Sequence, residues 1–310
     1  MSLHLQRRSR AIDALAAAGI DMLVCGRQDH INYVTGAHQL WTAGTRPFGP
    51  VCTLNVATAE IFLLSTWDEG VPGDIDLDHL HGITWSEAII YQRLAATPGI
   101  AEANRVGIDA WSPGMASLLS AVAPNAEIVP ADDILAQARR TKLPSEVDAI
   151  RAACAVAAAG AAAAIAHSGT DAQRLAAGVE AMALAGSSTP AAEPWVKGPI
   201  VDFSCIRSHY EGGLGRTSGG AAELTAGLIA ACIPGATGEH LRQAAPDGEW
   251  LVRGCGMGLE PPVINTRYGK GEVLEADLVL SVGASIGANY RRNIVLVTET
   301  TPEILSLETA

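Results

Sequence analysis

The sequence GCGMGLEPPVIN, from Gly254 to Asn265, decides how the second half of this chain is interpreted. Residues 251–254 predict a strand, so Cys255 is expected just after it, in a glycine-flanked turn whose backbone can approach a ligand closely. Two more apolar segments follow, VLEADLVLSVGAS from Val273 to Ser285 and NIVLVTE from Asn293 to Glu299, and each contains a predicted strand. The last third of the chain is therefore predicted to be rich in strands.

The first part of the chain alternates helix and strand. Residues 7–19 have helical periodicity and end on a glycine, a common helix C-cap, and residues 21–26 follow as a buried strand. Further strands are predicted at 51–57, 60–65 and 126–131, with a helix at 116–123. This alternation indicates a mixed or parallel sheet with helices packed against it.

A domain boundary is predicted near residues 138–153. Pro144 suits the first position of a helix, and two long helices are expected there, at 145–167 and 170–185. A second helical pair is expected at 221–232 and 238–245. We therefore predict two domains, 1–138 and 139–310.

Composition narrows the classes of partner and compartment. The chain has 310 residues, of which 48% are hydrophobic and 17% charged, as in an ordinary globular protein. A net charge of −12 argues against nucleic acid as a partner, and six scattered cysteines without a CxxC pair suit reduced thiols. The alanine-rich segment 152–166 is too short for a membrane span. We expect a cytoplasmic protein with no membrane partner.

Several of these segments resemble the creatinase, prolidase and aminopeptidase P family of pita-bread metallopeptidases. Residues 7–36 resemble the start of its N-terminal domain, in which a helix and a strand precede a turn containing Tyr-x-Thr-Gly. Residues 141–153 resemble the start of its second domain, 201–217 its paired strands, and 254–299 its GHGxG, EP and VLVTE segments. The resemblance implies an α/β (α+β) fold, with a creatinase-type N-terminal domain followed by a truncated pita-bread domain.

The same resemblance shows that most metal ligands are missing. The family's five ligand positions fall on Asp202, Gly213, Cys255, Gly283 and Arg292. A divalent metal pair needs several anionic oxygens and an imidazole in a small volume, whereas one carboxylate, one thiol and a guanidinium do not supply them. We therefore expect no metal and no other cofactor.

A second departure concerns the family's catalytic histidine. It normally lies on a hairpin before the first metal-ligand strand, but only residues 186–199 separate the second long helix from that strand here. The hairpin and its histidine are thus predicted to be deleted. A rival register would instead place His209 and Tyr210 on that histidine, with the deletion further along the chain, and the match of Arg216-Thr217 argues against it.

Three groups are candidates for catalysis without a metal. Cys255 with His209 would form a thiol–imidazole nucleophile, or Cys255 is a small inert residue that fills the ligand's place. Asp202 with His209, Tyr210 or Glu211 would form a general acid–base set, or Asp202 hydrogen-bonds a turn. Glu260 stands near the glutamate of the family's His-Glu-x-Pro, or is an ordinary turn residue.

Candidate substrate-binding residues come from both domains. Arg292 is expected to pair with a carboxylate through its planar guanidinium, and Tyr210 and Arg216 are expected to lie beside it. His38, Trp41 and Arg46 belong to an aromatic and polar loop that, in the family, reaches over the partner's active cavity across a dimer. A homodimer is therefore expected, and ordinary surface packing of this loop is the alternative.

We predict a metal-independent enzyme that acts on a small polar, carboxylate-bearing molecule by C–N hydrolysis, elimination or rearrangement. The contrasting hypothesis is a catalytically inactive relative of the peptidases that serves as a ligand- or protein-binding module. Function must be argued from the site, because one fold supports many reactions.

Overall fold

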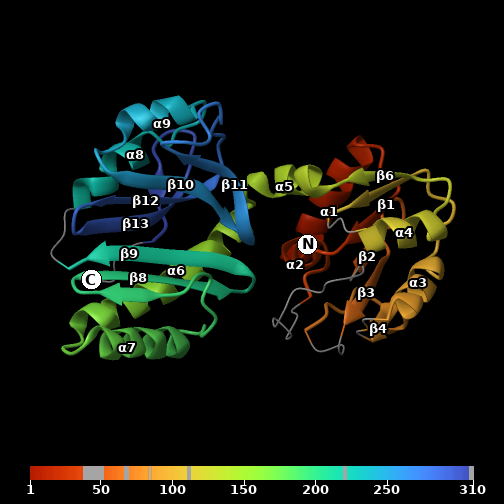
Figure 1. Cartoon of the computed structure of the whole chain (residues 1–310), viewed down its shortest axis with the longest axis horizontal. Coiled ribbons are helices and arrows are strands. Elements are labelled where there is room, and N and C mark those ends of the chain that lie inside the picture. Colours follow the sequence, from red (N-terminus) through yellow and green to blue (C-terminus); the bar gives the residue numbers. More distant parts are fainter. Residues whose placement is uncertain are drawn as a thin grey trace. The chain divides into compact units, whose positions relative to one another are not determined.

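The computed structural model describes residues 1–37, 52–65, 70–82, 84, 86–109, 113–218 and 222–306. The chain divides into two compact units, Met1–Arg139 and Arg140–Ala310, which we call the N-terminal and C-terminal domains (Figure 1). The division lies one residue beyond the end of the predicted range 1–138. The loop that contains His38, Trp41 and Arg46 lies outside the described residues.

The N-terminal domain is built on a mixed sheet with the strand order β4-β3-β2-β1-β5-β6. The central strand β1 runs antiparallel to β2 and parallel to β5, so the predicted mixture of directions is confirmed. Its strands are β1 (Met22–Cys25), β2 (Cys52–Asn55), β3 (Ile61–Ser65), β4 (Leu80–Gly82), β5 (Arg105–Ile108) and β6 (Glu127–Pro130). Its helices are α1 (Leu3–Ala17), α2 (Gln28–Thr35), the short η1 (Leu77–His79), α3 (Glu87–Ala95), α4 (Pro113–Val122) and α5 (Asp132–Arg140).

The segment around the Tyr-x-Thr-Gly sequence forms helix α2 and not the turn expected from the resemblance. Gly36 ends this helix in the left-handed region with φ 72°, which a residue with a side chain rarely adopts. Helix α3 and strand β5 were not predicted. The apolar run of β5 is only four residues long, which is too short to show a period.

The C-terminal domain is built on an antiparallel sheet with the order β11-β10-β12-β13-β9-β8-β7, and β14 pairs with β13. Its strands are β7 (Trp195–Lys197), β8 (Ile200–Arg207), β9 (Tyr210–Thr217), β10 (Glu249–Gly256), β11 (Gly258–Asn265), β12 (Val279–Ile286), β13 (Asn289–Leu296) and β14 (Glu303–Ile304). Its helices are α6 (Pro144–Ala166), α7 (Asp171–Leu184), η2 (Ala222–Thr225), α8 (Ala226–Ala230) and α9 (Gly238–Ala244).

Two helical pairs cover this sheet, as Figure 1 shows. Helices α6 and α7 pack on β8 and β9 in a core that includes Met182, Phe203 and Leu214. Helices α8 and α9 pack on β10, β12 and β13 through residues such as Leu241 and Val282. Among the described residues, α6 alone is long and apolar enough to cross a membrane, and half of its apolar window is buried inside the protein, as in a core helix.

Cys255 lies inside strand β10 and not in the predicted turn. It pairs with Leu259 across the β10–β11 hairpin, and only Met257 separates the two strands. The hairpin between β8 and β9 is as tight: Ser208 and His209 form its two-residue loop with φ 49° and 74°. Both central residues of a type I′ turn need such positive φ values.

Candidate active site of the C-terminal domain

The sheet gathers three of the positions that the resemblance marks as metal ligands, Asp202, Gly213 and Gly283, around the side chain at a fourth, Arg292. This residue lies on β13 directly opposite Gly283 of β12, and its backbone also pairs with Gly215 of β9. Its Nε donates a 2.8 Å hydrogen bond to Oδ2 of Asp202, and its Nη2 donates to Oδ1 of the same carboxylate. The pair is bidentate, which is the strong geometry for a guanidinium and a carboxylate.

The guanidinium of Arg292 also fills the space above Gly213. A Cβ built on Gly213 would collide with Nη1 and would lie 2.9 Å from Cζ of Arg292. Nη2 donates a further bond of 3.1 Å to the carbonyl of Phe203. The arginine therefore occupies the volume that a second acidic ligand at position 213 would need, and the first ligand position, Asp202, is bound to it.

Tyr290 completes this cluster from the same face of β13, two residues before Arg292. Its hydroxyl donates a short hydrogen bond to Oδ2 of Asp202. Burial, followed by the negative charge of Asp202, raises the pKa of Tyr290 well above its usual value. Burial alone would lower the pKa of Arg292, but the charge and hydrogen bonds of Asp202 outweigh burial and raise the pKa above its usual value. The Tyr290 phenol therefore stays protonated and the Arg292 guanidinium stays charged.

A second buried ion pair lies on the neighbouring strands. Arg253 of β10 donates to both carboxylate oxygens of Glu211 on β9, and the Nη1–Oε2 distance is 3.0 Å. The thiol of Cys255 points at the same region and donates to the carbonyl of Glu211 at 3.5 Å. Burial, followed by the charge of Glu211, raises the pKa of the Cys255 thiol well above its usual range. A buried, protonated thiol is a poor nucleophile.

Glu260 is a buried structural carboxylate and not a turn residue on the surface. Its Oε2 lies 2.6 Å from Nζ of Lys142, and its Oε1 accepts a 2.9 Å bond from the amide of Met257. The side chains of Lys142 and Glu260 are only 2% and 6% exposed. This pair ties the start of the C-terminal domain to the tip of the β10–β11 hairpin.

The structure does not bring His209 to Asp202. Asp202 pairs with Gly215, whereas His209 is in the loop beyond the pair Arg207–Tyr210, five residue pairs along the hairpin. That separation is about 16 Å at roughly 3.3 Å per residue. The predicted pairing of Asp202 with His209 is therefore wrong, because the same two-residue turn that aligns β8 with β9 places the histidine at the far end of the hairpin. The recorded partner of the Cys255 thiol is a backbone carbonyl and not this imidazole.

Tyr210 and Arg216 also have structural partners. The Tyr210 hydroxyl donates a 2.8 Å bond to the buried Glu146, near the start of α6. The guanidinium of Arg216 donates to the carbonyls of Gly215 and Arg292, at 2.7 and 2.9 Å. Both side chains are buried, so the prediction that they contact a substrate is corrected: they hold the sheet and helix together.

A cavity of about 290 Å³ opens beside Arg292 on this face of the sheet. Because side chains alternate along a strand, the odd-numbered residues that line it from β10 and β12 face away from helices α8 and α9, whereas Trp250 and Ala284 belong to the core beneath these helices. Its polar lining comes from Glu249, Arg253, Ser281, Ser285, Tyr290 and Arg292, and its remaining lining from Trp250, Leu251, Gly283 and Ala284. A cavity near this size, with a few convergent polar groups, is typical of a small-ligand site.

The residues present do not fit a pair of metal ions. Asp202 is the one carboxylate at the five ligand positions, and both of its oxygens already accept bonds from Arg292 or Tyr290. Within the described part of the chain there is no group of three or more histidine, cysteine, aspartate or glutamate side chains suited to hold a metal. The positively charged guanidinium of Arg292, at one of the five ligand positions, repels a metal cation.

Sequence analysis missed Arg253 and Tyr290, although a signal for both was present. Residues two apart on a strand share a face, so Tyr290 accompanies Arg292 and Arg253 accompanies Cys255. The partners across the sheet were hidden, because Asp202 and Arg292 are 90 residues apart in sequence.

Comparison with known proteins supports this interpretation of the fold. Residues 7–141 match the family model described as the Creatinase/Prolidase N-terminal domain. The whole chain is similar to the prolidase from Pyrococcus horikoshii, with a TM-score of 0.74, 16% identity, and 98% of this chain and 99% of the other covered. It is similar to an Xaa-Pro dipeptidase from Bacillus anthracis, with a TM-score of 0.76, 16% identity and coverage of 98% and 97%.

An X-Pro aminopeptidase from Thermotoga maritima gives a TM-score of 0.75 at 15% identity, with 97% of both chains covered. No curated protein matches the chain by sequence. The two domains together have the architecture of a prolidase, with a creatinase-type domain followed by a pita-bread domain. The sequence of residues 7–141 thus identifies a creatinase/prolidase N-terminal domain, and the whole chain has the fold of the prolidases and X-Pro aminopeptidases.

Proposed function

We propose that this protein is a member of the family that has lost metal-dependent peptidase chemistry and binds a small polar, carboxylate-bearing molecule in the C-terminal cavity. The observation that carries the proposal is the position of Arg292. Its guanidinium is bound to Asp202, overlies Gly213 and stands opposite Gly283, so one organic cation fills the place of the metals. Without metal ligands at these positions, the reaction cannot use a metal-bound water as its nucleophile.

The cavity supports binding of an anionic group. Arg253 and Arg292 both line it, and Ser281, Ser285 and Tyr290 add hydroxyl groups along the same face. Each arginine already pairs with a buried carboxylate, so the two guanidinium groups are held rigidly. Rigid donors lose little conformational entropy when a ligand binds.

A second candidate function is the metal-independent enzyme, and Glu249 and Ser285 favour it. These two residues pair directly across β10 and β12 and both line the cavity. A carboxylate beside a hydroxyl can transfer a proton to or from a bound molecule. This alternative predicts that a bound carboxylic acid is converted to product, whereas a binding module releases it unchanged.

The first test measures metals and peptidase activity on the purified chain. Elemental analysis should find far less than one zinc, manganese or cobalt ion per chain, and added metal should not produce hydrolysis of Xaa-Pro dipeptides. Stoichiometric metal together with dipeptide hydrolysis would overturn the proposal.

The second test measures binding of small mono- and dicarboxylic acids by calorimetry, with product analysis of each bound acid. Gly283→Val should weaken binding at least tenfold, because the new side chain enters the cavity while its Cβ keeps ordinary contacts of 3.7–3.8 Å. Gly271→Val is the matched control, since a Cβ there meets nothing within 4 Å and the residue does not line the cavity. Equal binding by both variants would place the ligand elsewhere.

A further inference from the structure

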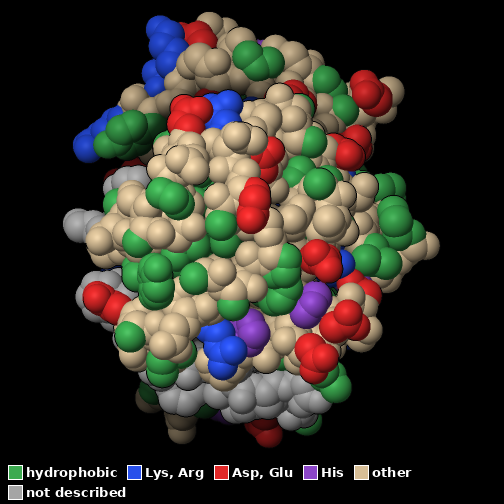
Figure 2. All heavy atoms as spheres, turned by 90° about the vertical axis from the view of Figure 1, so that its right-hand side faces the viewer, with side chains coloured by type: hydrophobic (Ala, Val, Ile, Leu, Met, Phe, Trp, Pro, Cys, Tyr) green, Lys and Arg blue, Asp and Glu red, His purple; other side chains and the backbone are tan. Residues whose placement is uncertain are grey.

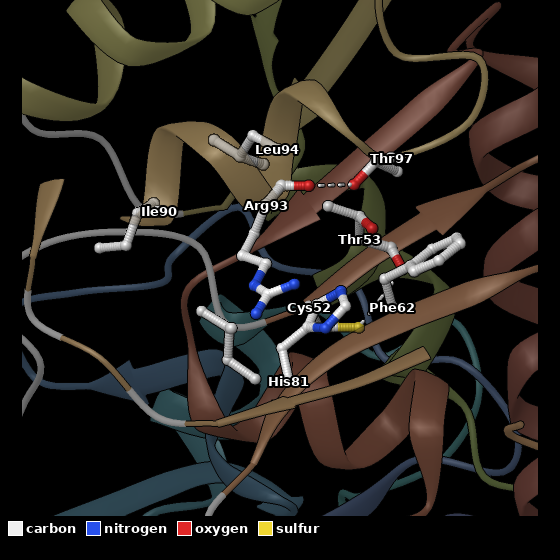
Figure 3. Close-up of a pocket in the computed structure, with 9 residues that line it drawn as sticks. Cys52, Thr53, Phe62, His81, Ile90, Arg93, Leu94 and Thr97 are labelled. Carbon is white, nitrogen blue, oxygen red and sulfur yellow. Dashed lines mark hydrogen bonds between the residues drawn. The ribbon is translucent and has the colours of Figure 1, made fainter. Parts of the chain in front are cut away.

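The N-terminal domain contains a small pocket of its own, between strands β2, β3 and β4 and helix α3 (Figure 3). Its volume is about 20 Å³, enough for a water-sized group or the head of a ligand. The apolar part of its lining comes from Phe62, Leu64, Ile90 and Leu94, and the rest from Cys52, Thr53, His81, Arg93 and Thr97.

Strand register explains why these side chains converge. Thr53 pairs with Phe62, and Leu64 pairs with His81, so all four project from the face of the sheet that also carries Val24. Val24 packs with Ile90 and Leu94 of α3 in one core cluster. The pocket is thus a gap in this core, close to its edge.

The floor of the pocket has an unmet hydrogen-bonding group. Thr53 is only 4% exposed, and its Oγ1 has no hydrogen-bond partner among the described residues. A buried hydroxyl without a partner is costly, on the order of 1–3 kcal/mol, and such groups are rare in folded proteins. A polar atom bound in the pocket would satisfy it.

Basic groups lie at the other side of the same pocket. Figure 3 shows the guanidinium of Arg93 beside the imidazole of His81, and Cys52 and Thr53 also line the pocket. The neighbouring His79 stacks on Phe62 at 4.0 Å between ring centroids. Figure 2 shows histidine side chains next to a Lys or Arg side chain on one face of the molecule. This grouping attracts an anion in a chain whose net charge is −12.

We propose that this pocket binds the carboxylate of a small apolar acid, with Arg93, His81 and Thr53 as hydrogen-bond donors and Phe62, Leu64, Ile90 and Leu94 around its short hydrocarbon part. The guanidinium supplies the charge, and the buried hydroxyl selects a ligand that reaches the floor. The apolar walls disfavour a fully hydrated inorganic anion. The site is separate from the C-terminal cavity.

The electrostatics of His81 give a direct signal for this binding. Burial lowers the pKa of His81, and the positive charges of Arg93 and His79 lower it further. The negative charge of a carboxylate bound between Arg93 and His81 would offset the positive charges of Arg93 and His79, and would thereby raise the pKa of His81. The test is an NMR titration of His81 in the full chain, with and without propionate.

Propionate should raise the pKa of His81 in a saturable way and leave that of His240, in the other domain, unchanged. Arg93→Gln should weaken the binding at least tenfold, because hydrogen bonds to charged groups are the stronger ones. Thr53→Val should also weaken binding but should not destabilise the unliganded protein, because its hydroxyl has no partner to lose. If Thr53 had only a structural role, Thr53→Val would instead destabilise the unliganded protein and leave propionate binding unchanged.

Gly283→Val serves as the matched control, since it changes the other cavity and should leave the His81 response intact. Three results would overturn the proposal. The first is no saturable shift of His81 with propionate, which would mean that a water fills the pocket. The second is an equal shift with chloride or sulfate, which would mean an unselective basic surface. The third is unchanged propionate binding in both Arg93→Gln and Thr53→Val.

Discussion

Replacing Arg292 by alanine should destabilise the C-terminal domain by about 3–5 kcal/mol, the usual effect of removing one partner of a buried ion pair. The side chains of Arg292 and Asp202 are only 12% and 10% exposed, and three hydrogen bonds from Arg292 to Asp202 and Phe203 would be lost. The carboxylate of Asp202 would remain buried with Tyr290 as its recorded partner. An uncompensated buried charge accounts for most of the effect.

The matched control is Arg151→Ala. Arg151 pairs with Glu303 at 2.7 Å, but the two side chains are 41% and 46% exposed. Because solvent screens such pairs, this change should alter the free energy of unfolding by less than about 1 kcal/mol. Both changes remove the arginine of an arginine–carboxylate pair, and the two pairs differ in how deeply they are buried.

A triple variant separates the unpaired charge from the lost packing. Asp202→Leu, Tyr290→Phe and Arg292→Met together remove the charges and the phenol, so the triple variant should be markedly more stable than Arg292→Ala. Urea unfolding should be combined with hydrogen exchange of the β8 and β9 amides, because two domains need not unfold in one step. A loss below 1 kcal/mol in Arg292→Ala, or a triple variant less stable than it, would refute the reasoning.

Three further predictions concern the ion pairs of Asp29, the thiol of Cys255 and the oligomeric state. Burial alone would raise the pKa of Asp29, but Arg139, His30 and Arg27 lower it to about 2, below its ordinary 3.8. The ion pairs of Asp29 therefore stabilise the N-terminal domain by about 2 kcal/mol above pH 4. This stabilisation is lost as the pH falls from about 4 to about 2. Asp29→Asn should remove that part of the acid dependence in a pH series of urea midpoints, and an unchanged profile would contradict it. Cys255 should react with a disulfide reagent at pH 8 only after unfolding, since it is fully buried; rapid labelling of the native protein, detected by mass spectrometry, would restore it as a candidate nucleophile. Light scattering should give the mass of a homodimer, and a monomer at micromolar concentration would end the proposal that the loop with Trp41 serves a partner's cavity.

Local patterns predicted many of the elements. Helix α6 was predictable because Pro144 occupies its first position and Glu146 accepts a bond from the Leu143 amide, while alanines allow close packing on the sheet. The short elements were not predictable in this way, because β5 has no readable period and the resemblance implies a turn where the chain forms α2. Tertiary context decides such short segments.

For the site, the sequence identified the positions but not the contacts. It predicted that Arg292 pairs with a carboxylate, yet the carboxylate in the structure is the protein's own Asp202. That pairing depends on β13 lying beside β9, a register set by the whole sheet. His209 shows the opposite error: proximity in sequence to Tyr210 and Glu211 suggested a shared site, whereas its turn carries it to the far end of the hairpin.

The glycine beneath Arg292 constrains the order in which this chain could change. At Gly213 any side chain would meet the guanidinium, so an aspartate there would require the side chain of Arg292 to move. Conversely, removing Arg292 first leaves Asp202 without its cation. Substitutions at positions 213 and 292 are therefore coupled, because each alters the surroundings of the other residue. The arginine thus makes the effects of substitutions at positions 202, 213 and 292 non-additive.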